Sequence, residues 1–210
     1  MTRLGLVLRG LAIALGCAAG LVAAAVAGVL PPVATSARLP AGGFAGSPLP
    51  PGLHAPPVTL HDERGRPLRL GGDGRPALIA FATAACEDAC ALTLQTMRIA
   101  LDDVGGDVPA VAVAVDPQRD TAARARRFLQ RQRVAGRIRF ALGTRAQLTR
   151  VWRAFGVQPQ TAAIHHQARI VLLDGRGRQR VGYFTQDTTP DQIAHDLRLF
   201  AGGRPAAAGR

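Results

Sequence analysis

The sequence contains no lysine and no asparagine, so all 26 of its basic residues are arginines. The formal net charge is +12. This composition is typical of a GC-rich genome, and we do not take it as a sign of a nucleic-acid partner. Internal repeats are also absent. The 210 residues suit one domain of ordinary size plus some additional sequence.

Charge of either sign is absent from residues 11–30, LAIALGCAAGLVAAAVAGVL. About 20 helical residues span about 30 Å, which is the thickness of a bilayer core. Because Arg3 and Arg9 precede this run, the N-terminus is expected to stay in the cytoplasm while the rest of the chain crosses. We therefore predict a single-pass anchor over residues 1–30 in the bacterial cytoplasmic (inner) membrane, with the following domain on the periplasmic side.

Two alternatives to the anchor remain open. A cleaved signal peptide is one, although the apolar run is longer than a typical signal-peptide core. A lipoprotein signal ending at Cys17 is the other, although Ala14, Leu15 and Gly16 make a poor lipobox. In the anchor reading, Cys17 is simply a small apolar residue of a membrane helix.

Proline, glycine and alanine dominate residues 31–57, which we interpret as a semi-extended tether. The folded domain is expected over residues 58–202, a length sufficient to bury a core. Residues 203–210 are expected to form a disordered tail.

Alternating and apolar patterns predict the elements of this domain. Strands are expected at 58–62 and 66–70 (a hairpin), 77–83, 109–115, 138–142, 168–174 and 178–184, and helices at 87–104, 121–134 and 145–155. Asp120 is expected to cap the second helix, and Thr189 to cap a last helix that starts at Pro190. This order predicts an α/β sandwich with a mixed sheet, and its end is typical of a thioredoxin-like domain.

Two cysteines, Cys86 and Cys90, follow the predicted strand 77–83 in the segment CEDAC. They lie at the start of a predicted helix, and helix N-termini stabilise anions. Both thiols are therefore expected to ionise more easily than free cysteine, an effect that Glu87 and Asp88 partly oppose.

The spacing of these cysteines favours metal chelation over a disulfide. Residues i and i+4 of a helix have Cβ atoms about 5–6 Å apart, whereas a relaxed disulfide needs about 3.8 Å. A bridge would require the turn to deform, would be easily reduced, and would stabilise the fold little because the loop is short. Two sulfur ligands of a trigonal metal site lie about 4 Å apart, which this pair can reach. Reversible oxidation of the two thiols is expected as a second state of the pair.

Two thiolates form an incomplete ligand set, and soft sulfur together with imidazole suits copper. The histidines that could complete the set are His54, His61, His165, His166 and His195. His165 and His166 directly precede the predicted strand 168–174, whose preceding loop approaches the cysteine helix in this fold. The residues alone leave the choice between these two histidines open.

Three segments in this order resemble the Sco family, also called SenC. They are LIAFATAACEDACALTL, AVAVDPQRDT and IHHQARIVLLDGRGR, and the resemblance covers about residues 57–202. Counting back eight residues from Asp174, as the family pattern runs, reaches His166. The sequence departs from the family at Glu87 and Ala91, which stand where prolines usually follow the cysteines, and also at Ala82 and Gln167. None of these departures removes a ligand.

The resemblance implies a thioredoxin-like domain that binds copper through Cys86, Cys90 and His166. It implies a membrane-anchored metallochaperone that delivers copper to the dinuclear site of cytochrome c oxidase, with the apo oxidase subunit or another copper chaperone as partner. Some family members act as thiol-disulfide reductases or redox sensors, in which case Cys86 and Cys90 would be catalytic. A peroxidase of this fold is disfavoured, since CEDAC lacks the threonine of the usual peroxidatic loop.

Two polar features have both a structural and a functional interpretation. Asp116, Arg119 and Asp120 of DPQRDT are expected to shape the chain between a strand and a helix, rather than to transfer copper directly. Arg124, Arg127 and Arg131 would share one face of the predicted helix 121–134. That face is either simply solvated or a docking surface for an acidic partner or anionic headgroups.

Overall fold

The computed structural model describes residues 43–86, 88–158, 169–184 and 187–201. The predicted membrane anchor, much of the predicted tether, the predicted tail and both His165 and His166 lie outside these residues. Within them, none of the helices combines the length and apolar character that crossing a bilayer requires.

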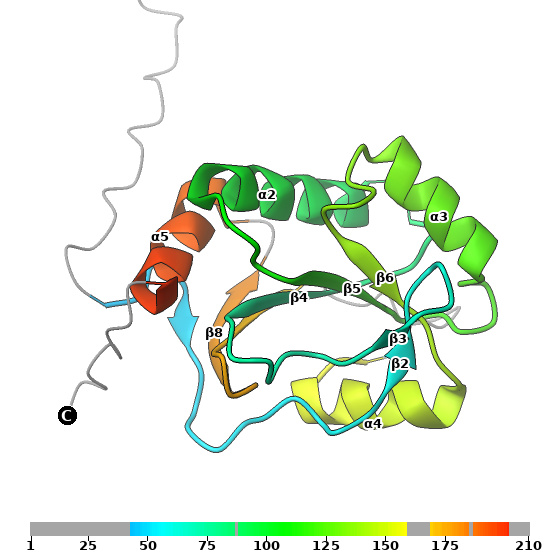
Figure 1. Cartoon of the computed structure of the whole chain (residues 1–210), viewed down its shortest axis with the longest axis horizontal. Coiled ribbons are helices and arrows are strands. Elements are labelled where there is room, and N and C mark those ends of the chain that lie inside the picture. The colour runs from blue at the N-terminus through cyan, green and yellow to red at the C-terminus, as the bar shows by residue number, and fades with distance from the viewer. Residues whose placement is uncertain (1–42, 87, 159–168, 185–186, 202–210) are drawn as a thin grey trace, which may run out of the picture. The chain divides into compact units, whose positions relative to one another are not determined.

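Six of the described strands form a mixed sheet with the order β1-β8-β7-β4-β5-β6 (Figure 1). The strands are β1 (Ser47–Pro48), β4 (Ala77–Ala82), β5 (Ala110–Ala114), β6 (Arg139–Ala141), β7 (Arg169–Leu173) and β8 (Gln179–Phe184). β4, β5 and β6 run parallel, whereas β7 is antiparallel to both β4 and β8. The predicted hairpin is confirmed as β2 (Leu60–His61) and β3 (Pro67–Leu68), which pair separately.

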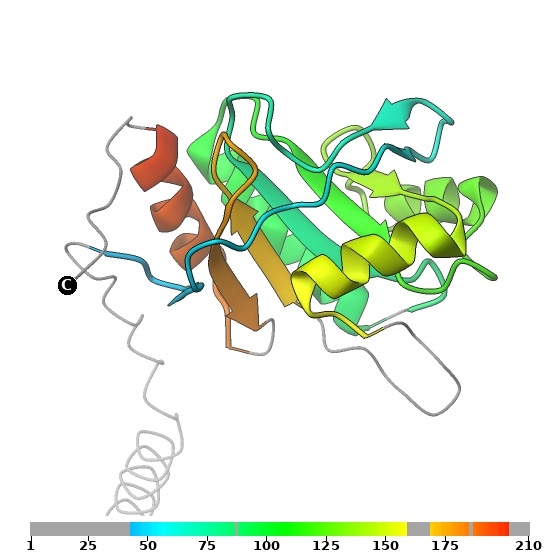
Figure 2. The same ribbon diagram turned by 90° about the horizontal axis from the view of Figure 1, so that it is seen from below.

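Four helices of the described residues flank this sheet. They are α2 (Ala89–Val104), α3 (Ala122–Arg131), α4 (Arg145–Phe155) and α5 (Pro190–Ala201). α2 and α5 pack together on one side, and Figure 2 shows α4 on the other side of the sheet. Thr189 caps α5 as predicted, since its Oγ1 accepts the Gln192 N–H at 3.4 Å and Gln192 returns a bond to the Thr189 N–H. The predicted α/β architecture with a mixed central sheet is confirmed.

The core surrounds β4, and every residue of this strand is buried, as its unbroken apolar run predicts. The Phe81 ring lies 5.3 Å from that of Phe155 on α4. Trp152 also lies on the buried side of α4, and its indole N–H donates to the carbonyl of Ala114 at 2.9 Å. These contacts join α4 to β4 and β5.

Part of the predicted tether belongs to the sheet. Ser47 in β1 lies opposite Gly182 of β8, which makes β1 an edge strand. The carboxylate of Asp196, which is buried, accepts hydrogen bonds from the backbone N–H groups of Ala45 and Gly46 and from the Tyr183 hydroxyl. The folded chain therefore includes residues ahead of Val58. A strand of two residues shows no alternation, and proline is tolerated at a sheet edge, so the sequence pattern did not reveal it.

Candidate metal centre at the cysteine pair

The cysteine pair lies where β4 passes into α2, as predicted. Cys86 is in the connecting loop and is half-buried, whereas Cys90 is in the first turn of α2 and is 1% exposed. The two cysteines are thiols in this structure. The Sγ atom of Cys86 accepts the backbone N–H of Cys90 at 3.3 Å.

This S···H–N contact replaces an ordinary helix cap. Asp88 occupies the N-cap position of α2, but its side chain makes no capping hydrogen bond. The N–H of Cys90 is one of the amides at a helix start that lack an intrahelical partner. The thiol of Cys86 satisfies that amide, and this holds the Cys86 side chain against the first turn that carries Cys90.

Burial raises the pKa of the Cys90 thiol above its ordinary value, and the hydrogen bond with Cys86 and the charge of Asp120 add to this rise. A hydrogen bond involving the Thr83 backbone acts in the opposite direction but is smaller. The expectation that both thiols ionise more easily than free cysteine is therefore wrong for Cys90. Desolvation outweighs the helix N-terminus, and the depth of Cys90 in the core could not be read from its position in the sequence.

The DPQRDT segment holds the cysteine loop in place. Asp120 is 5% exposed, and one of its carboxylate oxygens accepts the Thr83 hydroxyl at 2.9 Å and the Ala84 N–H at 2.8 Å. Its other oxygen accepts the N–H of Asp116 at 3.1 Å. Asp120 thus ties the loop after β5 to the loop after β4. In the loop after β4, Thr83 lies three residues before Cys86.

The contacts of DPQRDT inside the domain support its structural interpretation, with one correction. Arg119 forms an ion pair with Asp116, with 3.1 Å between Nε and Oδ2. Thr121, and not Asp120, caps α3, because its Oγ1 accepts the N–H of Arg124 at 3.3 Å. Burial raises the pKa of Asp120, the charge of Asp116 adds to the rise, and the hydrogen bonds of its carboxylate partly offset it. The carboxylate that suits a cap in sequence is engaged instead by the loop after β4.

Asp120→Asn is expected to expose Cys90 more often to solvent. The amide keeps one acceptor oxygen but presents an NH₂ donor in place of the other, either towards the Asp116 N–H or towards the Thr83 and Ala84 donors, and an unmet buried hydrogen bond costs about 1–3 kcal/mol. We expect Cys90 to be alkylated by iodoacetamide roughly tenfold faster, in line with that cost, as measured by mass spectrometry of the modified peptide. Asp187→Asn, an exposed change, is the control. An unchanged alkylation rate would show that Asp120 does not hold this loop.

Three of the candidate histidines lie away from the cysteine loop in sequence and have other neighbours. His54 bridges the backbone of Arg178 and His61 that of Leu142, while the His195 ring lies 3.2 Å from the carbonyl oxygen of Gly43. In the described part of the chain, no group of three or more His, Cys, Asp or Glu residues is arranged to hold a metal.

β7, the strand that follows His165 and His166 in sequence, begins at the end of the sheet where β4 leads into the cysteine loop. β7 runs antiparallel to β4, with Ile170 opposite Ala80. The first residues of β7 and the last residues of β4 therefore lie at the same end of the sheet. Both histidines fall outside the described residues, so the assignment of His166 stays a prediction.

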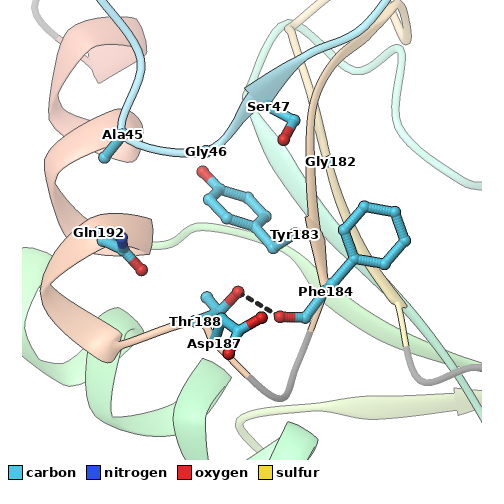
Figure 3. A pocket seen from close by; sticks show the side chains of 9 residues that line it. All are labelled: Ala45, Gly46, Ser47, Gly182, Tyr183, Phe184, Asp187, Thr188 and Gln192. Atoms are coloured by element: carbon cyan, nitrogen blue, oxygen red, sulfur yellow. Dashed lines mark hydrogen bonds between the residues drawn. The ribbon is translucent and has the colours of Figure 1, made fainter.

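A hollow elsewhere on the domain is distinct from this centre. It has a volume of about 230 Å³ and lies between β1, the end of β8 and the start of α5 (Figure 3). Its lining includes Tyr183, Phe184, Asp187 and Gln192, and contains no cysteine or histidine. It carries no ligand suited to a soft metal.

Comparison with known proteins identifies the family and the fold of the domain. The SCO1/SenC family model matches residues 51–202. Among solved structures, Bradyrhizobium japonicum ScoI with copper bound is 26% identical, with a TM-score of 0.58, and the match covers 75% of this chain and 99% of that one. No curated protein sequence matches the chain.

Two more distant structures share the fold. Yeast Sco1 is 17% identical, with a TM-score of 0.60 and coverage of 72% of this chain and 99% of its own. BsSco, described as having a disulfide switch and as a member of the Sco family of cytochrome c oxidase assembly proteins, is 18% identical. Its TM-score is 0.63, with coverage of 78% of this chain and 98% of its own. With most of its length matched by the family model, the chain belongs to the SCO1/SenC family.

Proposed function

We propose that this protein binds copper through Cys86, Cys90 and His166 and delivers it for maturation of the dinuclear copper site of cytochrome c oxidase. The domain would act on the periplasmic side of the bacterial cytoplasmic membrane, anchored by residues 1–30. Its partner would be the apo oxidase copper subunit or another copper chaperone. Family membership and the copper-bound structure of Bradyrhizobium japonicum ScoI support this proposal.

The observation that carries the proposal is the placement of two neighbouring thiols where β4 ends and α2 begins. The Cys90 N–H to Cys86 Sγ contact keeps the loop thiol beside the helix thiol. Sulfur ligands select Cu(I) among common biological metals, and imidazole is compatible with the same ion. Binding of the metal would displace the thiol protons, which offsets the reluctance of Cys90 to ionise on its own.

Copper would be the cargo of such a protein, so the centre must also release it. Cys86 is half-buried and lies in a loop, while Cys90 is buried in a helix. We expect thiols of the receiving protein to reach Cys86 first and to replace the ligands one at a time. Cys90 would be the second of the two sulfurs to release the copper ion.

The test compares two adjacent histidines in the full-length protein, kept in neutral detergent, reduced and anaerobic. Cu(I) is added, unbound metal is removed by desalting, and copper per chain is counted for the native protein, His166→Ala and His165→Ala. We expect the native protein and His165→Ala to retain one copper ion per chain, and His166→Ala to lose it. Because the two variants remove neighbouring imidazoles, they differ in position and not in chemistry.

Loss of copper only in His165→Ala would move the third ligand to that residue. Equal, full retention by both variants would exclude a histidine ligand from this pair. Negligible copper in the native protein would remove the delivery function.

A thiol-disulfide oxidoreductase that uses Cys86 and Cys90 is the second candidate. The disulfide switch of BsSco, a protein of the same fold, favours it. In that reaction the sulfur of Cys86 attacks a client disulfide, one client sulfur leaves with the electron pair, and Cys90 then resolves the mixed disulfide. Burial and the raised pKa make Cys90 a poor group for attack on an external client, so Cys86 would be the first nucleophile and Cys90 would attack only the mixed disulfide beside it. This reaction does not need His166, so reductase activity that survives in His166→Ala would distinguish it from copper binding.

A further inference from the structure

The exposed side of α3 carries three arginines, Arg124, Arg127 and Arg131, which we call the α3 basic face. All three are exposed and lie on one side of the helix. Within the described residues none of them lies within ion-pair distance of a carboxylate. The only hydrogen bond found there for their side chains joins Arg124 Nη1 to the carbonyl of Arg119 at 3.4 Å.

Some other arginines of the described residues lie beside carboxylates, whereas Arg69, Arg176 and Arg178, like the α3 basic face, do not. Arg66 pairs with Asp62, Arg75 with Asp73 and Asp107, Arg98 with Asp102, and Arg198 with Asp103. Between Arg119 and Arg153 the only acidic residue is Asp120, which is buried and bound to the cysteine loop. The positive charge of α3 is therefore exposed without a neutralising neighbour.

The helix α3, which carries this face, is also connected to the segment that carries the cysteines. Just ahead of α3, Asp120 accepts the N–H of Ala84 in the loop that leads to Cys86. Just after α3, the carbonyl of Gln132 accepts a hydrogen bond from the side chain of Gln95 on α2. Both ends of α3 are thus joined to the segment that carries the cysteines, which places α3 along one flank of the candidate metal centre.

We propose that the α3 basic face docks the protein that receives copper from Cys86 and Cys90, and that this protein presents an acidic surface around its metal-accepting thiols. The proposal rests on the proposed function. Charge complementarity of this kind steers association and raises its rate by about 10–10³-fold. Arginine also binds carboxylates through two parallel hydrogen bonds, which would set the orientation of the partner.

An acidic protein fits the location better than anionic lipid does. α3 flanks the loop of Cys86, so a membrane held against α3 would lie on a side from which an acceptor approaches the cysteines. An acidic rim on the acceptor would instead bring its thiols towards Cys86.

The test measures transfer of Cu(I) from the full-length protein in neutral detergent to two synthetic peptides. Both contain the same pair of cysteines, which are flanked by glutamates in one peptide and by glutamines in the other. The variant Arg124→Gln/Arg127→Gln/Arg131→Gln removes the face with a residue of similar helix propensity. The control, Arg69→Gln/Arg176→Gln/Arg178→Gln, removes the same charge from three other exposed arginines.

We expect the α3 variant to transfer copper to the glutamate peptide roughly tenfold more slowly than native protein at low salt, with the difference shrinking as salt rises. The control variant and the glutamine peptide should show no such loss. Equal slowing in both triple variants would reduce the effect to net charge and overturn the proposal. Native rates in the α3 variant would also overturn it.

Two further measurements separate the other outcomes. Copper-free protein is titrated with a fluorescent glutamate peptide that lacks cysteine, so docking is tested even if the chain retains no copper. If the native chain retains no copper, the proposed function fails. Equal peptide binding by the native protein and the α3 variant, by contrast, overturns the proposed docking surface. The last measurement is binding of the native protein and the α3 variant to vesicles that contain phosphatidylglycerol. Loss of vesicle binding by the α3 variant, with peptide binding unchanged, would assign the face to lipid and overturn the proposal.

Discussion

Cys86→Ser is expected to weaken Cu(I) binding by at least roughly 100-fold, since even losses of groups that only support a ligand cost 10–100-fold in metal affinity. A serine hydroxyl is a hard, weakly acidic group and does not replace a thiolate for Cu(I). Cys86 is the better of the two cysteines to change because it is half-buried in a loop, whereas Cys90 packs in the core. The measurement is a competition between the full-length protein and a chromophoric Cu(I) chelator at fixed pH.

The third cysteine of the chain provides a matched control. Cys17→Ser makes the same chemical change within the predicted membrane anchor and should leave Cu(I) affinity unchanged. Circular dichroism of each variant shows whether the fold is kept. Native affinity in a folded Cys86→Ser protein would contradict the ligand assignment, and equal losses in both variants would mean that the assay does not report on the Cys86–Cys90 centre.

Phe81→Ala is expected to lower the free energy of unfolding by about 3–5 kcal/mol, the usual cost of removing a buried phenylalanine ring. Phe81 is 0% exposed, belongs to the central strand β4, and packs against Phe155 of α4. Its loss would leave a cavity between the sheet and that helix. Thermal or urea unfolding, followed by circular dichroism, measures the change.

Phe184→Ala is the matched control for the core prediction. Phe184 is the last residue of β8 and is 55% exposed, so its truncation should cost about 1 kcal/mol or less. A similar cost for both changes would mean that the ring of Phe81 does not lie in the core as described. Because β4 leads directly into the cysteine loop, Phe81→Ala should also weaken Cu(I) binding, whereas Phe184→Ala should not.

Much of the domain could be predicted because its elements carry local signals. β4 and β5 are buried on both faces of the sheet and read as unbroken apolar runs. Thr189 and Pro190 mark the start of α5 by capping chemistry alone. The position of Cys86 and Cys90 between a strand and a helix followed from these same signals.

Other features depend on contacts between distant segments and left no local signal. β1 exists because Ser47 and Pro48 meet β8, far along the chain. Asp120 resembles a helix cap in sequence, but Thr83 and Ala84 engage its carboxylate instead. No local sequence signal marks Thr83 as a supporting residue, since a threonine before a cysteine has many ordinary explanations.

The sequence by itself determined the donor set and its spacing: two thiols four residues apart, a histidine pair before a later strand, and an arginine-rich helix. These are properties of residue type and order, and resemblance to a family added His166 to them. Only the tertiary structure decided how deeply Cys90 is buried, which way its pKa moves, which carboxylate holds the loop, and which helix flanks the cysteines. The physical reason is that desolvation and long-range hydrogen bonds arise from the packing of distant segments, and are not encoded in any one of them.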